Sequence, residues 1–151
     1  MADNQIDINV KLMQSVEFFS KFEPGELAEV AKHSLITKYI DFDYVVKEGV
    51  VDDCSFYIVL SGKLAVYKAR KGFAQKIALL GKGECFGEMS ILLEEGRSTS
   101  VQATGDCFLL CLNSQTMVTM PLAIQLKLAW AIGKALAQKL KKQNLGSTGI
   151  M

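Results

Sequence analysis

The spacing of apolar residues changes character twice along the chain. From residue 9 to residue 33 they recur every three or four positions, as in Leu12, Val16 and Phe19, which is the spacing of an amphipathic helix. Pro24 interrupts this stretch, and proline suits the first turn of a helix, where its missing N–H leaves nothing unpaired. The stretch therefore predicts two short helices.

Between residues 34 and 113 the apolar residues gather in short β-branched and aromatic runs. Turn-forming pairs and triplets such as Ser61-Gly62 and Gly81-Lys82-Gly83 separate the runs. The runs cover residues 35–40, 44–47, 56–60, 64–69, 76–80, 99–103 and 108–112. Several short strands in succession predict a roll or a sandwich. Residues 87–93 lie between two such runs and predict a short helix.

Helical spacing returns after the strands, in residues 114–144. Ser114 is a candidate N-cap, and Pro121 marks a break before a longer helix. The apolar stripe of that helix, near heptad spacing, consists of Leu122, Leu126, Ala129, Gly133, Leu136 and Leu140. We expect this stripe to pack on the roll or on a second copy of the chain.

Length and charge narrow the class of protein. The 151 residues, half of them apolar, suffice for one compact domain over residues 1–151. Seventeen basic and sixteen acidic residues give a net charge of +1, which supplies no field to attract nucleic acid. The N-terminus lacks the features of a secretory signal, and no run approaches the roughly 18 apolar residues of a spanning helix. We therefore expect a cytoplasmic protein that binds neither nucleic acid nor membranes.

Catalytic and metal chemistry find little support in the sequence. Cys54, Cys85, Cys107 and Cys111 lie in apolar segments without a CxxC motif or a Cys/His cluster, so we expect buried reduced thiols and no metal. His33, the only histidine, has no nucleophile or acid near it in a recognisable motif. Because no nucleophile and base, acid/base pair or metal cluster is evident, we expect that the protein is not an enzyme.

The segment with the most chemical content is residues 85–101, CFGEMSILLEEGRSTSV. Gly87 allows the backbone to approach a ligand, the helix after it offers free N–H groups to an anion, and Arg97 follows closely. Each feature also has an ordinary explanation. Arg97 could pair with a glutamate of the Glu94-Glu95 loop, and Glu88 could stabilise the helix N-terminus.

The order of these residues resembles a known family. Phe86-Gly87-Glu88-Met89-Ser90 followed by Arg97-Ser98-Thr99-Ser100-Val101 is similar to the phosphate-binding cassette of cyclic nucleotide-binding domains. The resemblance covers roughly residues 18–144, because further family motifs follow in order, namely Gly49, Phe56-Tyr57-Ile58-Val59, Ser61-Gly62, Ile77-Ala78 and Leu80-Gly81. It implies an α+β fold, an eight-stranded antiparallel β-roll of the jelly-roll type. N-terminal helices, a cassette helix and C-terminal helices that close over the ligand would complete it.

The resemblance also implies a ligand and its contacts. The ligand would be cyclic AMP or cyclic GMP, with no other cofactor. Arg97 would pair with the exocyclic phosphate oxygens, Glu88 would accept from the ribose 2′-hydroxyl, and backbone N–H groups would complete the cradle. The candidate ligand-binding residues are Phe86, Gly87, Glu88, Met89, Ser90, Arg97, Ser98 and Thr99.

Some features leave choices open. Ser98 stands where many relatives that bind cyclic GMP have threonine and many that bind cyclic AMP have alanine, so the base is undecided and we expect cyclic AMP. Trp130 either covers the base or makes a core or dimer contact. Phe42 replaces a usual glycine, and the stretch from Gly49 to Asp52-Asp53 is slightly longer than usual. We expect the turn at Phe42 to be built differently, and neither departure to touch the cassette.

The leading hypothesis is a regulatory sensor that binds a cyclic nucleotide. Because neither a helix-turn-helix nor a channel or kinase segment is evident, we expect a module without an effector domain of its own. A protein partner, or a second copy bound through the C-terminal helix, would read the signal. The alternative is a structural or interaction module that keeps the roll without the ligand. Such degenerate members usually lose the cassette arginine or glutamate, and this chain has both.

Overall fold

The computed structural model describes the backbone of residues 2–147 and the side chains of residues 4–143. Three helical elements precede the roll: α1 (Ala2–Gln14), the 3₁₀ turn η1 (Glu17–Phe19) and α2 (Pro24–His33). The first helix begins well before residue 9. Pro24 is the first residue of α2, and the N–H of Glu23 donates to Glu26 Oε1 at 2.9 Å in a capping box that fixes this start.

Eight antiparallel strands form the roll, in two sheets of four. They are β1 (Leu35–Tyr39), β2 (Tyr44–Val46), β3 (Phe56–Ser61), β4 (Leu64–Arg70), β5 (Phe73–Leu80), β6 (Cys85–Phe86), β7 (Ser100–Ala103) and β8 (Cys107–Leu112). The strand orders are β1-β8-β3-β6 and β2-β7-β4-β5, and every pairing is antiparallel. The predicted fold class is confirmed. Strand β6 was not predicted as a strand because two residues are too few to show periodicity.

Strands β3 and β8 explain the continuous apolar runs of the sequence. Successive side chains of a strand point to opposite faces. Phe56 and Ile58 of β3 pack in a core with the helices, whereas Val59 packs in a second core between the two sheets. On β8, Leu110 faces the helices and Leu109 faces the roll interior. A strand buried on both faces has no polar face, so its sequence does not alternate.

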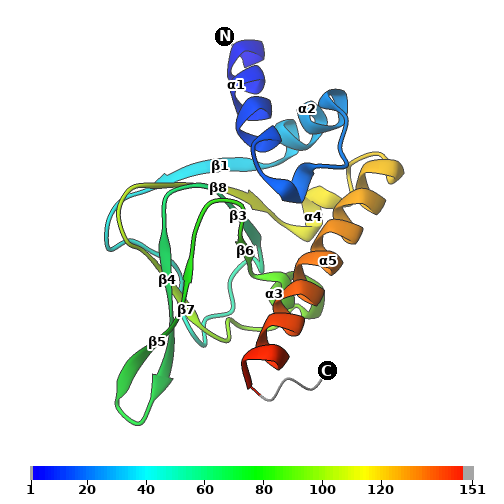
Figure 1. Cartoon of the computed structure of the whole chain (residues 1–151). Helices are drawn as coiled ribbons and strands as arrows, with labels where there is room; N and C mark the ends of the chain where they lie inside the picture. The colour runs from blue at the N-terminus through cyan, green and yellow to red at the C-terminus, as the bar shows by residue number, and fades with distance from the viewer. Residues whose placement is uncertain (1, 148–151) are drawn as a thin grey trace.

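The long C-terminal helix α5 (Leu122–Ser147) runs beside the roll, past the cassette helix α3 (Glu88–Leu93) (Figure 1). Its buried face carries Ile124, Leu128 and Ile132, which join the helix-side core. The predicted stripe does not pack on the roll, and its contact with a second copy of the chain stays a prediction. Leu122 and Leu126 are 81% and 60% exposed. The buried residues Ile124, Leu128 and Ile132 recur every fourth position, outside the heptad row that the sequence analysis selected.

Two local expectations need correction. Asn113, and not Ser114, caps the short helix α4 (Ser114–Met117), because its Oδ1 accepts the N–H of Thr116 at 2.9 Å. The turn at Phe42 keeps a left-handed backbone, with φ of 73°. Its N–H donates to the carbonyl of Ala103 at 3.0 Å, so a hydrogen bond to β7 helps hold a conformation that favours glycine.

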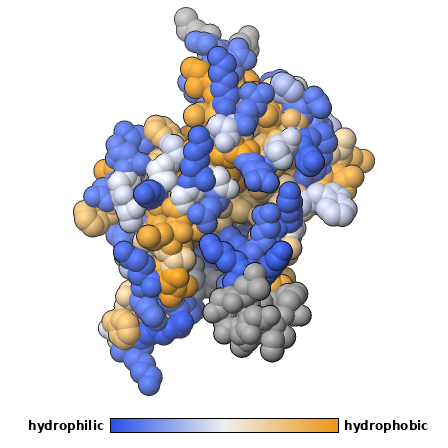
Figure 2. Space-filling view, in the orientation of Figure 1, coloured by the Kyte–Doolittle hydropathy of each residue, from blue (hydrophilic) through white to orange (hydrophobic). Residues whose placement is uncertain are grey.

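The hairpin of β4 and β5 extends from the roll (Figure 1). Strand β5 is an edge strand, and its Phe73, Ile77 and Leu79 are exposed. Figure 2 shows hydrophobic side chains at the surface over this hairpin. Exposed apolar side chains gathered on one element are a typical feature of a binding surface.

Gly62, in the turn from β3 to β4, should tolerate no side chain. Its φ is +91°, and a Cβ would overlap Cys107 and the carbonyl of Asp106. Gly62→Ala should lower the free energy of unfolding by roughly 2–5 kcal/mol, from backbone strain and overpacking together. Gly72→Ala is the matched control, since Gly72 has φ of +89° but no atom near its Cβ position. Urea unfolding would measure both losses, and equal losses would contradict the packing argument.

Candidate functional site

The cassette begins at the junction of β6 and α3. Gly87 caps α3 with φ of 90°. A Cβ at this position would lie 2.6 Å from the carbonyl oxygen of Ser55 and 2.9 Å from Nη1 of Arg97. Glycine is therefore required here both by the backbone conformation and by the close approach of Arg97.

One cavity brings the sequence-predicted residues together. Its volume is about 490 Å³, and the candidate ligand-binding residues Phe86, Gly87, Glu88, Met89, Ser90, Arg97, Ser98 and Thr99 all line it. Apolar residues of the strands form another part of the wall: Val46, Val66, Ile77, Ala78, Leu79, Leu80 and Val101. Lys139, Lys142 and Gln143 of α5 line it as well. The cavity thus combines charged groups with an apolar wall.

Arg97 is the most unusual side chain of the site. It is 4% exposed, and its Nε donates to both carboxylate oxygens of Asp52, at 3.1 and 2.9 Å. Its guanidinium also lies 5.8 Å from the ring centre of Tyr57. Its Nη1 and Nη2 are buried, and neither has a hydrogen-bond partner among the described residues. Buried donors of a charged group without protein acceptors are rare, and they suit an anionic ligand.

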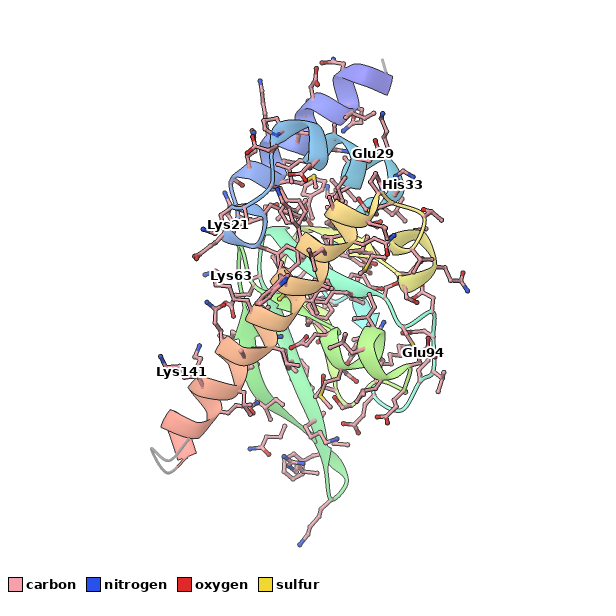
Figure 3. All side chains as sticks on the ribbon, turned by 90° about the vertical axis from the view of Figure 1, so that its right-hand side faces the viewer. Lys21, Glu29, His33, Lys63, Glu94 and Lys141 are labelled. Atoms are coloured by element: carbon pink, nitrogen blue, oxygen red, sulfur yellow. The ribbon has the colours of Figure 1, made fainter. Side chains whose placement is uncertain are left out.

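The ion pair of Arg97 differs from the one considered from sequence. Glu94 and Glu95 are exposed at the end of α3, where Figure 3 labels Glu94, and the partner is Asp52 instead. Burial opposes the charge of Asp52, but hydrogen bonds from Arg97 and from the N–H of Cys54 outweigh it and hold the pKa of Asp52 below its ordinary value. Asp52 therefore stays ionised at neutral pH.

The long loop before β3 touches the cassette, contrary to expectation. The N–H of Gly49 donates to the carbonyl of Arg97 at 2.8 Å, and the N–H of Arg97 donates to the carbonyl of Val50 at 3.0 Å. Asp52 follows in the same loop. This role of Asp52 could not be predicted from local patterns, because Asp52 and Arg97 are 45 positions apart and Asp52-Asp53 is an ordinary turn sequence.

Glu88 opens α3 and is also paired across the cavity. It is 6% exposed, and its Oε1 lies 2.8 Å from Nζ of Lys139. The same ammonium donates to the carbonyl oxygen of Cys85. Lys139 was not among the candidate residues predicted from the sequence. The ion pair joins α5 to the start of the cassette.

The remaining cassette residues hold its shape. Phe86 stacks on Tyr57, with ring centres 4.9 Å apart and an interplanar angle of 14°. Ser90 is buried, and Met89 is 52% exposed. The carbonyl of Ser98 accepts from Lys68 Nζ at 2.8 Å, which fixes the chain just after Arg97.

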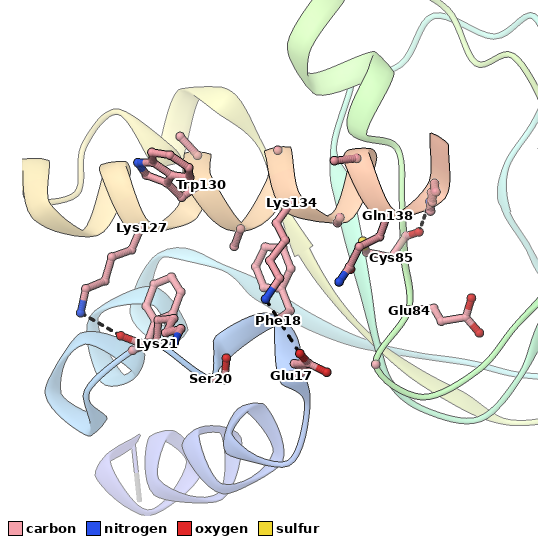
Figure 4. Close-up of a pocket in the computed structure, with 18 of the residues that line it drawn as sticks. Glu17, Phe18, Ser20, Lys21, Glu84, Cys85, Lys127, Trp130, Lys134 and Gln138 are labelled. Carbon is pink, nitrogen blue, oxygen red and sulfur yellow. Dashed lines mark hydrogen bonds and ion pairs between the residues drawn. The ribbon is translucent and has the colours of Figure 1, made fainter. Parts of the chain in front are cut away.

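A second, larger groove lies between η1 and α5 (Figure 4). Its volume is about 1040 Å³, and Phe18, Phe22 and Trp130 are among its lining residues. Trp130 is 73% exposed and lines this groove, so it lies in neither the core nor the cassette cavity. The expectation that Trp130 packs in the core is therefore wrong.

The cysteines are free, but only two of them are buried, Cys85 and Cys107. Cys54 and Cys111 are half-buried, which corrects the expectation for both. Burial raises the pKa of the Cys85 thiol to about 12. Over residues 2–147, no cluster of histidine, cysteine and carboxylate side chains suits a metal ion, and no helix is long and apolar enough to cross a membrane.

The chain is similar in sequence to known proteins. The family model described as "Cyclic nucleotide-binding domain" matches residues 37–120. The chain is 31% identical over 123 residues to the cyclic nucleotide-gated channel alpha-2 of Bos taurus, a match that covers 78% of this chain and 18% of the channel. It is 36% identical over 92 residues to the cyclic AMP receptor protein of Thermus thermophilus, covering 60% of this chain and 42% of the receptor.

A solved structure shares the fold. The cyclic nucleotide-binding domain from Methylobacillus flagellatus superposes with a TM-score of 0.81 at 19% identity, covering 95% of this chain and 82% of that domain. The chain thus spans less than half the length of the two curated relatives above and most of the Methylobacillus flagellatus domain. The matched residues 37–120 include the whole cassette and most of the roll. This chain therefore belongs to the cyclic nucleotide-binding domain family.

Proposed function

We propose that the chain binds a 3′,5′-cyclic nucleotide in the cassette cavity and acts as a regulatory sensor. The observation that carries the proposal is the buried guanidinium of Arg97, whose Nη1 and Nη2 have no partner among the described residues and which lines the cavity. Asp52 holds Nε and thereby orients the fork. A phosphodiester offers two exocyclic oxygens, and two parallel N–H donors of arginine match such an anion.

The start of α3 supports the same proposal. The first N–H groups of a helix have no partner within the helix, and they favour an anion. Gly87, Met89 and Ser90 stand at that start and line the cavity, together with Ser98 beside Arg97. The N–H groups of these residues would surround the phosphate that Arg97 neutralises, and the buried carboxylate of Glu88 would accept from the ribose 2′-hydroxyl.

The purine has an apolar wall available. Ile77 and Leu79 of β5 are 47% and 63% exposed and line the cavity, as do the buried Val66 and Leu80. A flat aromatic base would cover these side chains and remove apolar surface from water. The charged and apolar parts of the cavity thus suit the phosphate-sugar and base parts of one ligand.

Of the two cyclic nucleotides, we favour cyclic AMP as the ligand. Ser98 lines the cavity with a short hydroxyl, which leaves room for either purine. The Thermus thermophilus relative is named a cyclic AMP receptor protein. A cyclic AMP ligand is therefore our working assignment.

A catalytic role has weaker support than a sensor role. The Cys85 thiol, with its pKa of about 12, stays protonated and is a poor nucleophile. The Nδ1 of His33 lies 2.9 Å from the carbonyl oxygen of Glu29 in its own helix, away from the cassette. We therefore propose a sensor that is not an enzyme. A purely structural module is disfavoured because it would gain nothing from the unpartnered donors of Arg97.

Arg97→Ala should weaken binding of the nucleotide by roughly 2–5 kcal/mol, because the phosphate would lose a desolvated cationic partner. Calorimetric titration with cyclic AMP and with cyclic GMP would measure the loss and decide the base. Arg70→Ala is the matched control, since Arg70 is exposed on β4 and outside the cavity wall. Wild-type affinity in the folded Arg97→Ala variant would contradict the phosphate assignment.

Glu88→Gln should weaken binding by about 1–3 kcal/mol, since a charged acceptor for the ribose hydroxyl becomes a neutral one. The same substitution should change the affinity for the 2′-deoxy nucleotide much less, because that ligand has no hydroxyl to donate. A parallel pair of titrations would separate the two cases. An equal loss for both ligands would show that Glu88 does not contact the 2′-hydroxyl.

The output of the sensor would pass through α5. Leu122, Leu126 and Trp130 lie four positions apart, on one side of the helix, and all are mostly exposed. Exposed apolar side chains in a row favour contact with a protein, either a partner or a second copy of this chain. We propose this row as the surface through which the module associates.

Leu126→Glu should abolish self-association if that row joins two copies, because a buried charge without a partner is strongly unfavourable at an apolar interface. Light scattering over a range of concentrations would report the mass of wild type and variant. Gln138→Glu, on an exposed part of the same helix, should leave the mass unchanged. If the wild-type protein is monomeric at every concentration, the row does not join two copies of the chain, and its partner would be a different protein.

A further inference from the structure

Lys139 makes two contacts that reach into the cassette from α5. Its Nζ lies 2.8 Å from Oε1 of Glu88 and donates to the carbonyl oxygen of Cys85. The Glu88 side chain is 8% exposed and that of Lys139 is 35% exposed. A carboxylate this deeply buried needs a donor or a positive charge close to it. Lys139 supplies that charge, and it does so inside the proposed ligand cavity.

The geometry points to Lys139 as the residue that determines how strongly the pocket distinguishes a ribose from a 2′-deoxyribose. This inference rests on the proposed function of the cavity and on Glu88 as the acceptor of the 2′-hydroxyl. Lys139 acts as a second partner for the same carboxylate. The Glu88 carboxylate therefore keeps one partner even when the ligand has no 2′-hydroxyl.

Lys139 affects the binding of the ribose and 2′-deoxyribose ligands differently. In the wild-type protein a 2′-deoxy ligand leaves Glu88 with Lys139 as its partner, so the missing hydroxyl costs less than it would without the lysine. Without the lysine, a 2′-deoxy ligand would cover a buried carboxylate that has no partner, whereas a ribose would still donate to it. An unsatisfied buried acceptor is far more costly than a lost hydrogen bond alone. Removing Lys139 should therefore increase the discrimination.

Lys139 reduces the discrimination between ribose and 2′-deoxyribose whether it leaves Glu88 or stays paired with it. A carboxylate has two oxygens that together accept several hydrogen bonds, and the ion pair uses Oε1. If the ribose hydroxyl displaces the ammonium, the ion pair opposes ribose binding. If both donors remain, the nearby positive charge lowers the value of the hydroxyl as a donor. Both routes reduce discrimination in the wild type.

The test is a set of calorimetric titrations with cyclic AMP and cyclic GMP, each paired with its 2′-deoxy form. The measured quantity is the ratio of the affinities for the ribose and deoxyribose forms. In Lys139→Gln the ratio should exceed that of the wild type by about tenfold, the scale of one hydrogen bond to a charged group. Lys139→Arg, which keeps the cation, should preserve the wild-type ratio.

Lys141→Gln is the matched control. It removes the same charge from the same helix, but Lys141 is exposed on the outer side of α5 and lies outside the described wall of the cavity (Figure 3). Its ratio should equal that of the wild type. Thermal unfolding would verify that each variant folds, and Lys139→Met provides a second uncharged variant.

The outcomes separate this inference from the proposed function. A ratio that is unchanged in Lys139→Gln and Lys139→Met, or that rises equally in Lys141→Gln, would overturn the role of Lys139 while the cavity remains a nucleotide site. A folded wild-type protein that binds neither cyclic nucleotide would overturn the proposed function, and this inference with it. A rise confined to the two uncharged variants at position 139 would support both.

Discussion

Arg97 carries a permanent positive charge into a part of the roll where it is almost completely shielded from water. Burying an unpaired charge is strongly unfavourable, and Asp52 compensates it from one side only. The other two nitrogens of the guanidinium keep their donors unpaired within the described part of the chain. Much of the surrounding structure serves to hold this arrangement.

The neighbours of Arg97 explain several separate features of the chain. A Cβ at Gly87 would lie only 2.9 Å from Nη1 of Arg97, so this position has no room for a side chain. The loop of Gly49 and Val50 exchanges two backbone hydrogen bonds with Arg97 and brings Asp52 into range. Tyr57 offers its ring to the guanidinium and stacks on Phe86, which leads into α3. The cassette is thus one packed unit built from segments distant in sequence.

The spacing of apolar residues and the turn residues predicted those helices and strands that depend on local sequence. The two N-terminal helices, Pro24 at the start of α2, the short helix after Gly87 and seven of the eight strands follow from spacing and turn residues, and the resemblance supplied the roll. What the patterns missed depends on tertiary contacts. Asp52 and Lys139 look like an ordinary turn residue and an ordinary helix charge until the fold brings them to Arg97 and Glu88. The packing face of α5 was missed because two rows of apolar residues run along the helix, and only contact with the core selects between them.

The two halves of α5 differ in how much apolar packing holds them. Up to Ile132 the helix is fixed in the core, since Ile124, Leu128 and Ile132 are almost fully buried, and Lys127 adds an ion pair to Glu26. Beyond that point no residue up to 143 is fully buried, and the polar contacts of Lys139 tie the helix to β6 and α3. Apolar burial varies little with the contents of a pocket, whereas an ion pair to Glu88 depends directly on what else donates to that carboxylate. A nucleotide bound as proposed would therefore bias the position of the second half of α5, while the first half stays anchored to the core.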